Sequence, residues 1–130
     1  MMIEVYTDGA SKGNPGLAGA GIFLKKASHL ERISVPLGIM TNHEAEFHAC
    51  IIALKRVSDQ GETIVSIRSD SKLLVDAVEK NYVKQTVYKQ LLEEIVELVQ
   101  AFDYCFFKWI PSKENKEADQ LARKAIRENS

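Results

Sequence analysis

The chain has 130 residues, of which 45% are apolar and 27% are charged, and this is the size and composition of one soluble globular domain. The net charge is −1, so a nucleic-acid partner would have to be held by a local patch or through metal ions. No apolar run approaches the roughly 18 residues of a membrane span, and we expect no membrane segment.

The first third of the chain predicts three strands. Residues 3–7 alternate apolar and polar side chains and end at an Asp-Gly turn signal, after which 9–16 form a loop rich in glycine, asparagine and proline. The segments 18–25 and 32–39 predict the second and third strands. Because the connections are short, we expect the three strands to form an antiparallel meander.

The rest of the chain predicts helices separated by single strands. Helices are expected at 41–58, 70–78, 85–101 and 115–127, and strands at 63–69 and 103–110. Strands separated by helices lie parallel through right-handed crossovers. The predicted fold is therefore α/β, a single domain over residues 1–130 whose five-stranded mixed sheet joins the meander to two parallel strands and is flanked by helices.

The cysteines favour a reducing compartment. Cys50 and Cys105 match no metal-ligand spacing and each lies in an apolar segment, so we expect buried free thiols. The chain begins with a predicted strand and shows no basic-then-apolar leader. We therefore expect a cytoplasmic protein, and we expect it to be a monomer.

Four acidic residues stand where the predicted fold would place them inward: Asp8, Glu46, Asp70 and Asp119. Asp8 and Asp70 end strands that can pair in parallel about 4.8 Å apart, and Glu46 and Asp119 lie on apolar stripes of helices. Two unit charges about 4 Å apart repel by roughly 4 kcal/mol at an effective dielectric near 20. Four clustered carboxylates need a compensating charge, which predicts a divalent metal site at the carboxyl edge of the sheet.

Each acid taken alone has a structural explanation. Asp70 could cap a helix and Asp8 could be a turn residue. Glu46 could extend to the surface, and Asp119 could pair with Arg123 four residues later. Because all four converge on one edge of the predicted sheet, a shared function is the better interpretation.

The segments around these acids carry a more specific pattern. They are 7–16 (TDGASKGNPG), 41–49 (TNHEAEFHA), 69–71 (SDS) and 115–122 (NKEADQLA). In order and spacing they resemble the four motifs of the type 1 ribonuclease H family, and the resemblance covers essentially the whole chain. The ribonuclease H-like fold of that family is the same mixed sheet predicted above.

The resemblance implies an endonuclease that hydrolyses the RNA strand of RNA·DNA hybrids with two Mg²⁺ or Mn²⁺ ions per site, leaving 5′-phosphate and 3′-hydroxyl ends. Asp8 would bridge both ions. Asp119 would complete the ion that activates water, and Glu46 with Asp70 would hold the ion on the leaving-group side. The resemblance also implies substrate contacts at eight positions: Gly9, Ser11, Gly13, Asn14, Thr41, Asn42, Ser71 and Asn115. For Thr41 and Ser71, turn and cap chemistry is an equally open interpretation.

Two other kinds of site are disfavoured. The loop at 9–16 is not a Walker sequence because Asn14 stands where a lysine would follow the glycine, and 16–21 does not match the dinucleotide fingerprint, so we expect no nucleotide cofactor. The aromatic residues of 104–109 are predicted as sheet core and not as a base-stacking platform.

Two features depart from the family pattern. The loop 111–114 lacks the histidine that many members carry there, and Lys113 or Glu114 could take its place; His43 and His48 are assigned no catalytic role. The segment 81–89 is short and only mildly basic where some relatives have a basic protrusion, so we expect weak, metal-dependent substrate affinity.

These departures keep two alternatives open. One is a nucleic-acid-binding module of the same fold with little or no activity, which the missing histidine favours and the retained acids oppose. The other is a nuclease of this fold that acts on DNA. The loop after Asp8 opposes this second alternative because it resembles the version that reads the 2′-hydroxyls of RNA.

Overall fold

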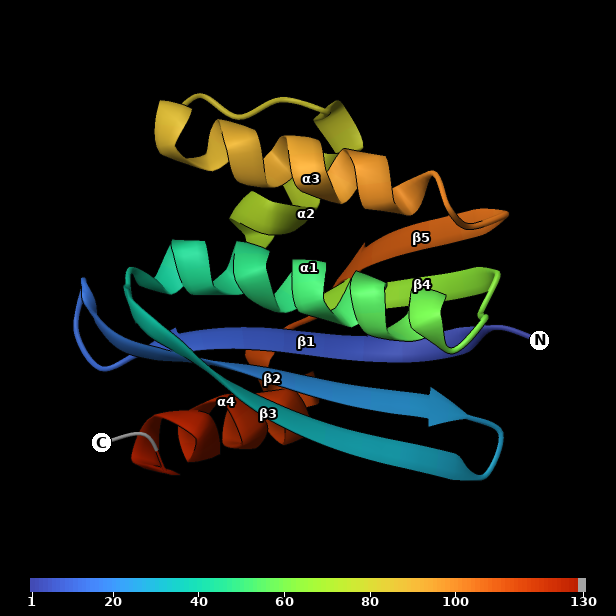
Figure 1. Ribbon diagram of the computed structural model, residues 1–130, viewed down its shortest axis with the longest axis horizontal. Coiled ribbons are helices and arrows are strands. Elements are labelled where there is room, and N and C mark those ends of the chain that lie inside the picture. The colour runs from blue at the N-terminus through green and yellow to red at the C-terminus, as the bar shows by residue number, and fades with distance from the viewer. Residues whose placement is uncertain (129–130) are drawn as a thin grey trace.

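The computed structural model describes residues 1–128, which form one five-stranded sheet flanked by helices (Figure 1). The strands are β1 (Ile3–Ser11), β2 (Gly16–Lys26), β3 (His29–Met40), β4 (Ile64–Ser69) and β5 (Tyr104–Trp109). The α-helices are α1 (Asn42–Asp59), α2 (Lys72–Lys80), α3 (Lys89–Val99) and α4 (Lys116–Glu128), with short 3-10 turns at Thr86–Tyr88 and Ser112–Glu114.

The sheet has the predicted mixed topology. Its strand order is β3-β2-β1-β4-β5, with antiparallel pairing between β1, β2 and β3 and parallel pairing from β1 through β4 to β5. β1 is therefore central, with an antiparallel neighbour on one side and a parallel neighbour on the other. The predicted fold class is confirmed.

Helices cover both faces of the sheet (Figure 1). The main core lies between the sheet and α1, α2 and α3, where Val5, Phe47, Leu54, Ile67 and Ile95 are fully buried. α4 packs on the other face, across β1, β2 and β3. Two helices from opposite faces thus approach β1, and this arrangement positions the site described below.

Side-chain caps set where two of the helices begin. Thr41 caps α1, as the sequence predicts, and Glu44 completes a reciprocal capping box with it. The hydroxyl of Ser71 accepts a hydrogen bond from the amide of Leu74 and caps α2. The predicted start of this helix at Ser69-Asp70 is therefore wrong by two to three residues, and Asp70 is not its cap.

Two other predicted boundaries differ from the structure. β1 does not end at a turn after Asp8 but continues to Ser11, because residues 18–25 of β2 pair with residues 4–11 of β1. The helix predicted over 85–101 is divided into a 3-10 turn and α3.

The prediction that the aromatic residues of 104–109 form sheet core is wrong for most of them. Tyr104, Phe106 and Trp109 are 61%, 52% and 49% exposed, and Phe107 packs against the core. The physical reason is that β5 is an edge strand. The thiols of Cys50 and Cys105 are free, with Cys50 buried and Cys105 partly buried. Within residues 1–128, none of the helices has the length and hydropathy needed to cross a membrane.

Candidate active site

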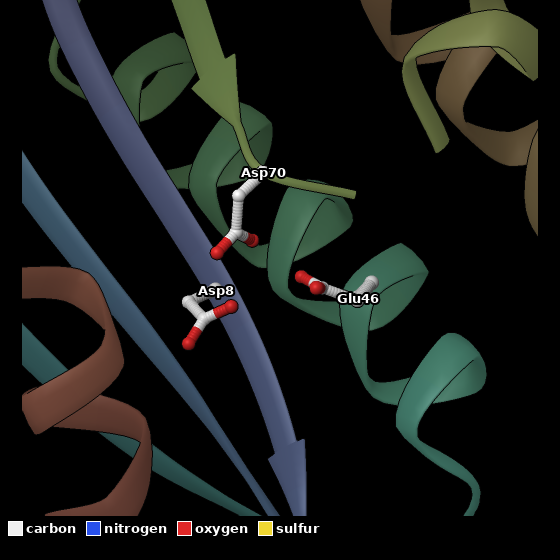
Figure 2. Close-up of side chains that lie close together, drawn as sticks. All are labelled: Asp8, Glu46 and Asp70. Carbon is white, nitrogen blue, oxygen red and sulfur yellow. The ribbon is translucent and has the colours of Figure 1, made fainter. Parts of the chain in front are cut away.

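Three carboxylates from separate segments meet at the carboxyl edge of the parallel strands (Figure 2). The last register pair of β1 and β4 is Thr7 with Ser69, so Asp8 and Asp70 are the next residues on the two neighbouring chains. Glu46 comes from the first turns of α1. Ligand oxygens of Asp8, Glu46 and Asp70 lie within 4.8 Å of one another.

Gly9 allows α1 to come close enough to contribute Glu46. A Cβ atom at Gly9 would lie 2.2 Å from the carbonyl carbon of Ala45, so no other residue fits without moving the helix. The amide of Gly9 also donates a hydrogen bond of 2.9 Å to Oε1 of Glu46. The residue after Asp8 therefore fixes both the distance of α1 and the orientation of its carboxylate.

Asp70 is held through its backbone. The indole Nε1 of Trp109 donates a hydrogen bond of 3.2 Å to the carbonyl oxygen of Asp70. This positioning contact was not expected, because the sequence does not show that the end of β5 lies beside the end of β4.

Asp119 is the fourth acid, and α4 brings it to the same cleft. A Cβ atom at Gly21 would lie 2.0 Å from the carbonyl oxygen of Ala118, so this glycine is what lets α4 pack closely on the sheet. Nδ2 of Asn115 donates to the carbonyl oxygen of Thr7 at 2.9 Å and ties the start of α4 to β1. The carboxyl of Asp119 lies close enough to Asp8 to contribute to the raised pKa of Asp8.

Asp119 also makes the ion pair that its sequence position allows. Nε of Arg123 lies 3.1 and 3.0 Å from its two carboxylate oxygens. Among residues 1–128, Asp119 is the one of the four acids that forms an ion pair with a basic side chain. The pair and the approach to Asp8 coexist, so the ion pair does not remove Asp119 from the site.

The electrostatics of the cluster favour a bound cation. Burial raises the pKa of Asp8 to about 10, with the charges of Glu46 and Asp70 adding to the effect. Burial, followed by the charge of Asp70, raises the pKa of Glu46 to about 8, although the Gly9 amide opposes this rise. The ligand set consists only of carboxylate oxygens, which are the ligands that Mg²⁺ and Mn²⁺ prefer. The residues present therefore fit a divalent metal.

We expect the affinity of the protein for Mn²⁺ to rise with pH. Because the folded pKa of Asp8 lies above the ordinary value of 3.8, folding takes up a proton, and the metal-free protein loses stability as pH rises from about 4 towards 10. A cation must displace that proton, so binding becomes tighter over the same range. Calorimetric titration in two buffers of different ionisation enthalpy measures the proton release, and an affinity independent of pH would contradict the clustering.

The predicted substrate positions at the β1–β2 loop form a polar network. Oδ1 of Asn42 accepts hydrogen bonds from the amide and the hydroxyl of Ser11, at 2.8 and 3.0 Å. Oδ1 of Asn14 accepts one from the amide of Asn42 at 2.8 Å, and the carbonyl of Gly13 is the alternative acceptor for the single hydroxyl proton of Ser11. Loop and helix are thereby joined. Ser11 and Asn42 line the same cleft as the acids, and Gly13 and Asn14 are exposed.

The other predicted substrate positions have structural contacts. Thr41 and Ser71 cap helices, Gly9 faces α1, and Asn115 is 1% exposed. Direct contact of these four with a substrate stays a prediction.

A cleft of about 830 Å³ surrounds the acids. All four carboxylates line it, and its wall includes six basic or imidazole side chains: Lys12, His43, Lys72, Lys116, Arg123 and Arg127. This basic rim was not predicted. Its one readable signal in the sequence is the spacing of 116, 119, 123 and 127, which places three basic residues on the face of α4 that carries Asp119.

Comparisons with known proteins agree with this fold. The chain is 42% identical over 127 residues to a protein named putative hydrolase EbsB from Enterococcus faecalis, covering 96% of this chain and 94% of that one. RNase H1 from Halobacterium salinarum superposes with a TM-score of 0.93 at 29% identity, over 98% of this chain and 99% of the other. LC11-RNase H1, isolated from compost and solved in complex with an RNA/DNA hybrid, superposes with a TM-score of 0.90 at 31% identity over 98% of both chains. The model of the RNase H family matches residues 1–127, and the chain belongs to this family.

Proposed function

We propose that this chain, acting as a single ribonuclease H-like domain, is a metal-dependent endonuclease that hydrolyses the RNA strand of RNA·DNA hybrids. Family and fold support ribonuclease H activity in general. The observation that carries the finer proposal is the convergence of Asp8, Glu46 and Asp70 within 4.8 Å, beside the loop that Asn42 orders. The solved relative in complex with an RNA/DNA hybrid supports the substrate class.

The proposal gives each part of the cleft a task. Asp8, Glu46, Asp70 and Asp119 would hold two Mg²⁺ or Mn²⁺ ions, which when bound stabilise the attacking and leaving oxygens at phosphorus. Ser11 and Asn42 line the cleft, and with Gly13 and Asn14 of the adjoining loop they would contact the 2′-hydroxyls that distinguish RNA from DNA. The basic rim would bind the phosphates flanking the cut.

The basic rim also answers how a chain of net charge −1 holds a polyanion. The Debye length is about 8 Å at physiological ionic strength, so a bound phosphate responds to the local charges of the rim and not to the charge of the whole molecule. The rim is expected to make binding of the hybrid sensitive to salt.

One assay tests the proposal. Labelled RNA·DNA hybrid, double-stranded RNA and double-stranded DNA are incubated with Mg²⁺ or Mn²⁺ and either the unaltered protein or Asp70→Asn. We expect cleavage of the hybrid alone, abolished by the substitution, with products carrying 5′-phosphates. Binding of the hybrid without cleavage would instead identify a binding module, and cleavage of duplex DNA would identify a DNA nuclease.

A further inference from the structure

α4 covers only β1, β2 and β3 on its face of the sheet, and the uncovered part of that face carries aromatic and basic side chains. On β5, Tyr104, Phe106 and Lys108 alternate onto one face, and Lys108 is the register partner of Arg68 on β4. Arg68 is in turn opposite Tyr6 on β1, two residues before Asp8 and on the same side of the strand. Asp8 pairs with Gly21, and a side chain at Gly21 would point at α4. The aromatic and basic residues therefore lie on the same face of the sheet as α4. We call Tyr6, Arg68, Tyr104, Phe106 and Lys108 the outer-face patch.

The aromatic rings of the patch are accessible and parallel. Tyr104 and Phe106 are 61% and 52% exposed, with ring centroids 6.1 Å apart and planes inclined by 1°. The guanidinium of Arg68 lies 5.5 Å from the centroid of the Tyr6 ring and donates hydrogen bonds to the Tyr6 hydroxyl and to Glu4. Parallel rings spaced along a strand can each stack against a successive planar base.

The charge of the patch suits an anion. Arg68 neutralises Glu4, the acid that lies on this face beside it. Lys108 is exposed and forms no ion pair with any of residues 1–128, and the same is true of Lys25, which lies opposite Glu4 in the sheet. Cations alternating with aromatic rings match a strand that alternates phosphates with bases, and an apolar protein surface would leave these lysines without partners.

A continuous path joins the patch to the catalytic cleft. Tyr6 lines a pocket of about 240 Å³ together with Lys25, Lys113 and Lys116, and acids at 114 and 117 stand at its wall. The acid at 117 is paired with Arg32. Lys116 lines both this pocket and the cleft that holds the carboxylates. A nucleic acid leaving the cleft can therefore follow lysine side chains around the start of α4 onto the sheet face.

We propose that the outer-face patch binds unpaired nucleotides that extend from the hybrid held in the cleft. The inference rests on the proposed function and adds a second contact, for the single-stranded continuation of the substrate. Bases stack on Tyr104 and Phe106 while phosphates lie against Lys108 and the lysines of the path. The contact selects hybrids with single-stranded extensions over blunt ones and has no sequence preference, because every base presents a stacking face.

The test compares affinities for a blunt RNA·DNA hybrid and for the same hybrid with a single-stranded DNA extension at either end. Binding is measured by fluorescence anisotropy for the unaltered protein and for the double variant Tyr104→Ser, Phe106→Ser. Ca²⁺ replaces Mg²⁺ in the buffer, and the substrate is checked afterwards to show that it was not cut. We expect the extension to tighten binding on the order of 5- to 100-fold through one or two stacked bases, and the double variant to lose that gain while binding the blunt hybrid as before. Val87→Ser, which removes a 58% exposed apolar side chain in the 3-10 turn Thr86–Tyr88, away from the sheet face of the patch, is the matched control and should keep the gain.

A charge variant tests the phosphate contact separately. Lys108→Gln should lower the slope of log affinity against log salt concentration for the extended hybrid by about one, the value of one lost phosphate contact. Lys89→Gln at the start of α3 should leave that slope unchanged. Cleavage of the blunt hybrid by the double variant, at the rate of the unaltered protein, shows that the fold and the cleft are intact. Equal affinities for blunt and extended hybrids in the unaltered protein would overturn the inference while leaving the proposed function standing. A patch-dependent dimer in light scattering, with no effect of the extension, would overturn it in favour of a contact between two copies of the chain.

Discussion

Replacing Asp8 by asparagine is expected to stabilise the metal-free protein and to abolish hydrolysis. Asp8 is 5% exposed, and burial and its acidic neighbours raise its pKa to about 10. The neutral amide removes the unfavourable protonation from folding. We expect a gain in the free energy of unfolding on the order of 2 kcal/mol near neutral pH, below the roughly 4 kcal/mol repulsion of two charges 4 Å apart at an effective dielectric near 20. Urea unfolding with a chelator measures it.

The pH dependence identifies the source of this gain. The aspartate of the unaltered protein is protonated in both states below the ordinary aspartate pKa of 3.8, so the advantage of Asp8→Asn should vanish there and grow as pH rises. Asp103→Asn, at an exposed position before β5, should change stability little at any pH. Hydrolysis should fall by about 10³-fold or more, since the loss of even one charge-stabilising donor typically costs 10²–10³. A loss of stability in Asp8→Asn without metal would mean that the cluster is not repulsive.

The cost of placing charges together explains why the acidic cluster was predictable from the sequence. Glu46 and Asp119 occupy positions of apolar helical stripes, and a carboxylate placed there is costly unless it serves a site. The helical period and the change from strands to helices likewise predicted the sheet topology correctly, because each depends on local alternation. Asp8 and Asp70 were predicted as neighbours on parallel strands, and the last register pair of β1 and β4, Thr7 with Ser69, confirms this although β1 itself continues to Ser11.

The features that local patterns could not predict depend on which segments become neighbours. The Asp-Gly pair at 8–9 has the sequence of a turn, yet β1 continues because β2 pairs with it through Ser11 and Ala18. The aromatic residues of β5 have the composition of a buried strand, and only the strand order reveals that β5 is an edge. The basic rim of the cleft draws on several separate segments, and only the part of it on α4 has a signal in the sequence.

Gly9 is the clearest case of a residue whose role depends on a distant segment of the chain. The family resemblance assigns Gly9 to substrate contact, whereas its hydrogen-bond partner Glu46 lies 37 residues later and its open side faces the backbone of α1. A pattern of neighbouring residues cannot reveal a contact between positions so far apart in the sequence. Whether Gly9 also contacts a substrate stays a prediction, but its packing against α1 is reason enough for a glycine at this position.

Gly9→Ala should therefore lose both stability and metal affinity. The added methyl group would lie 2.2 to 2.4 Å from backbone atoms of Ala45 and Glu46, and backbone cannot rotate away as a side chain can. Displacing α1 should cost about 1–3 kcal/mol or more and should move the Glu46 carboxylate away from Asp8. Denaturant unfolding and calorimetric titration with Mn²⁺ measure the two effects.

The matched control is Gly38→Ala. Gly38 has a φ of +84°, and a Cβ atom there would have no neighbour within 4 Å, so alanine bears only backbone strain of about 1–2 kcal/mol and leaves the cleft unchanged. If Gly9→Ala bound Mn²⁺ as tightly as Gly38→Ala does, the close approach of α1 would not be what holds Glu46 in the cluster. Reduced Mn²⁺ affinity in Gly9→Ala alone, at comparable losses of stability, would separate the geometry of the site from the stability of the fold.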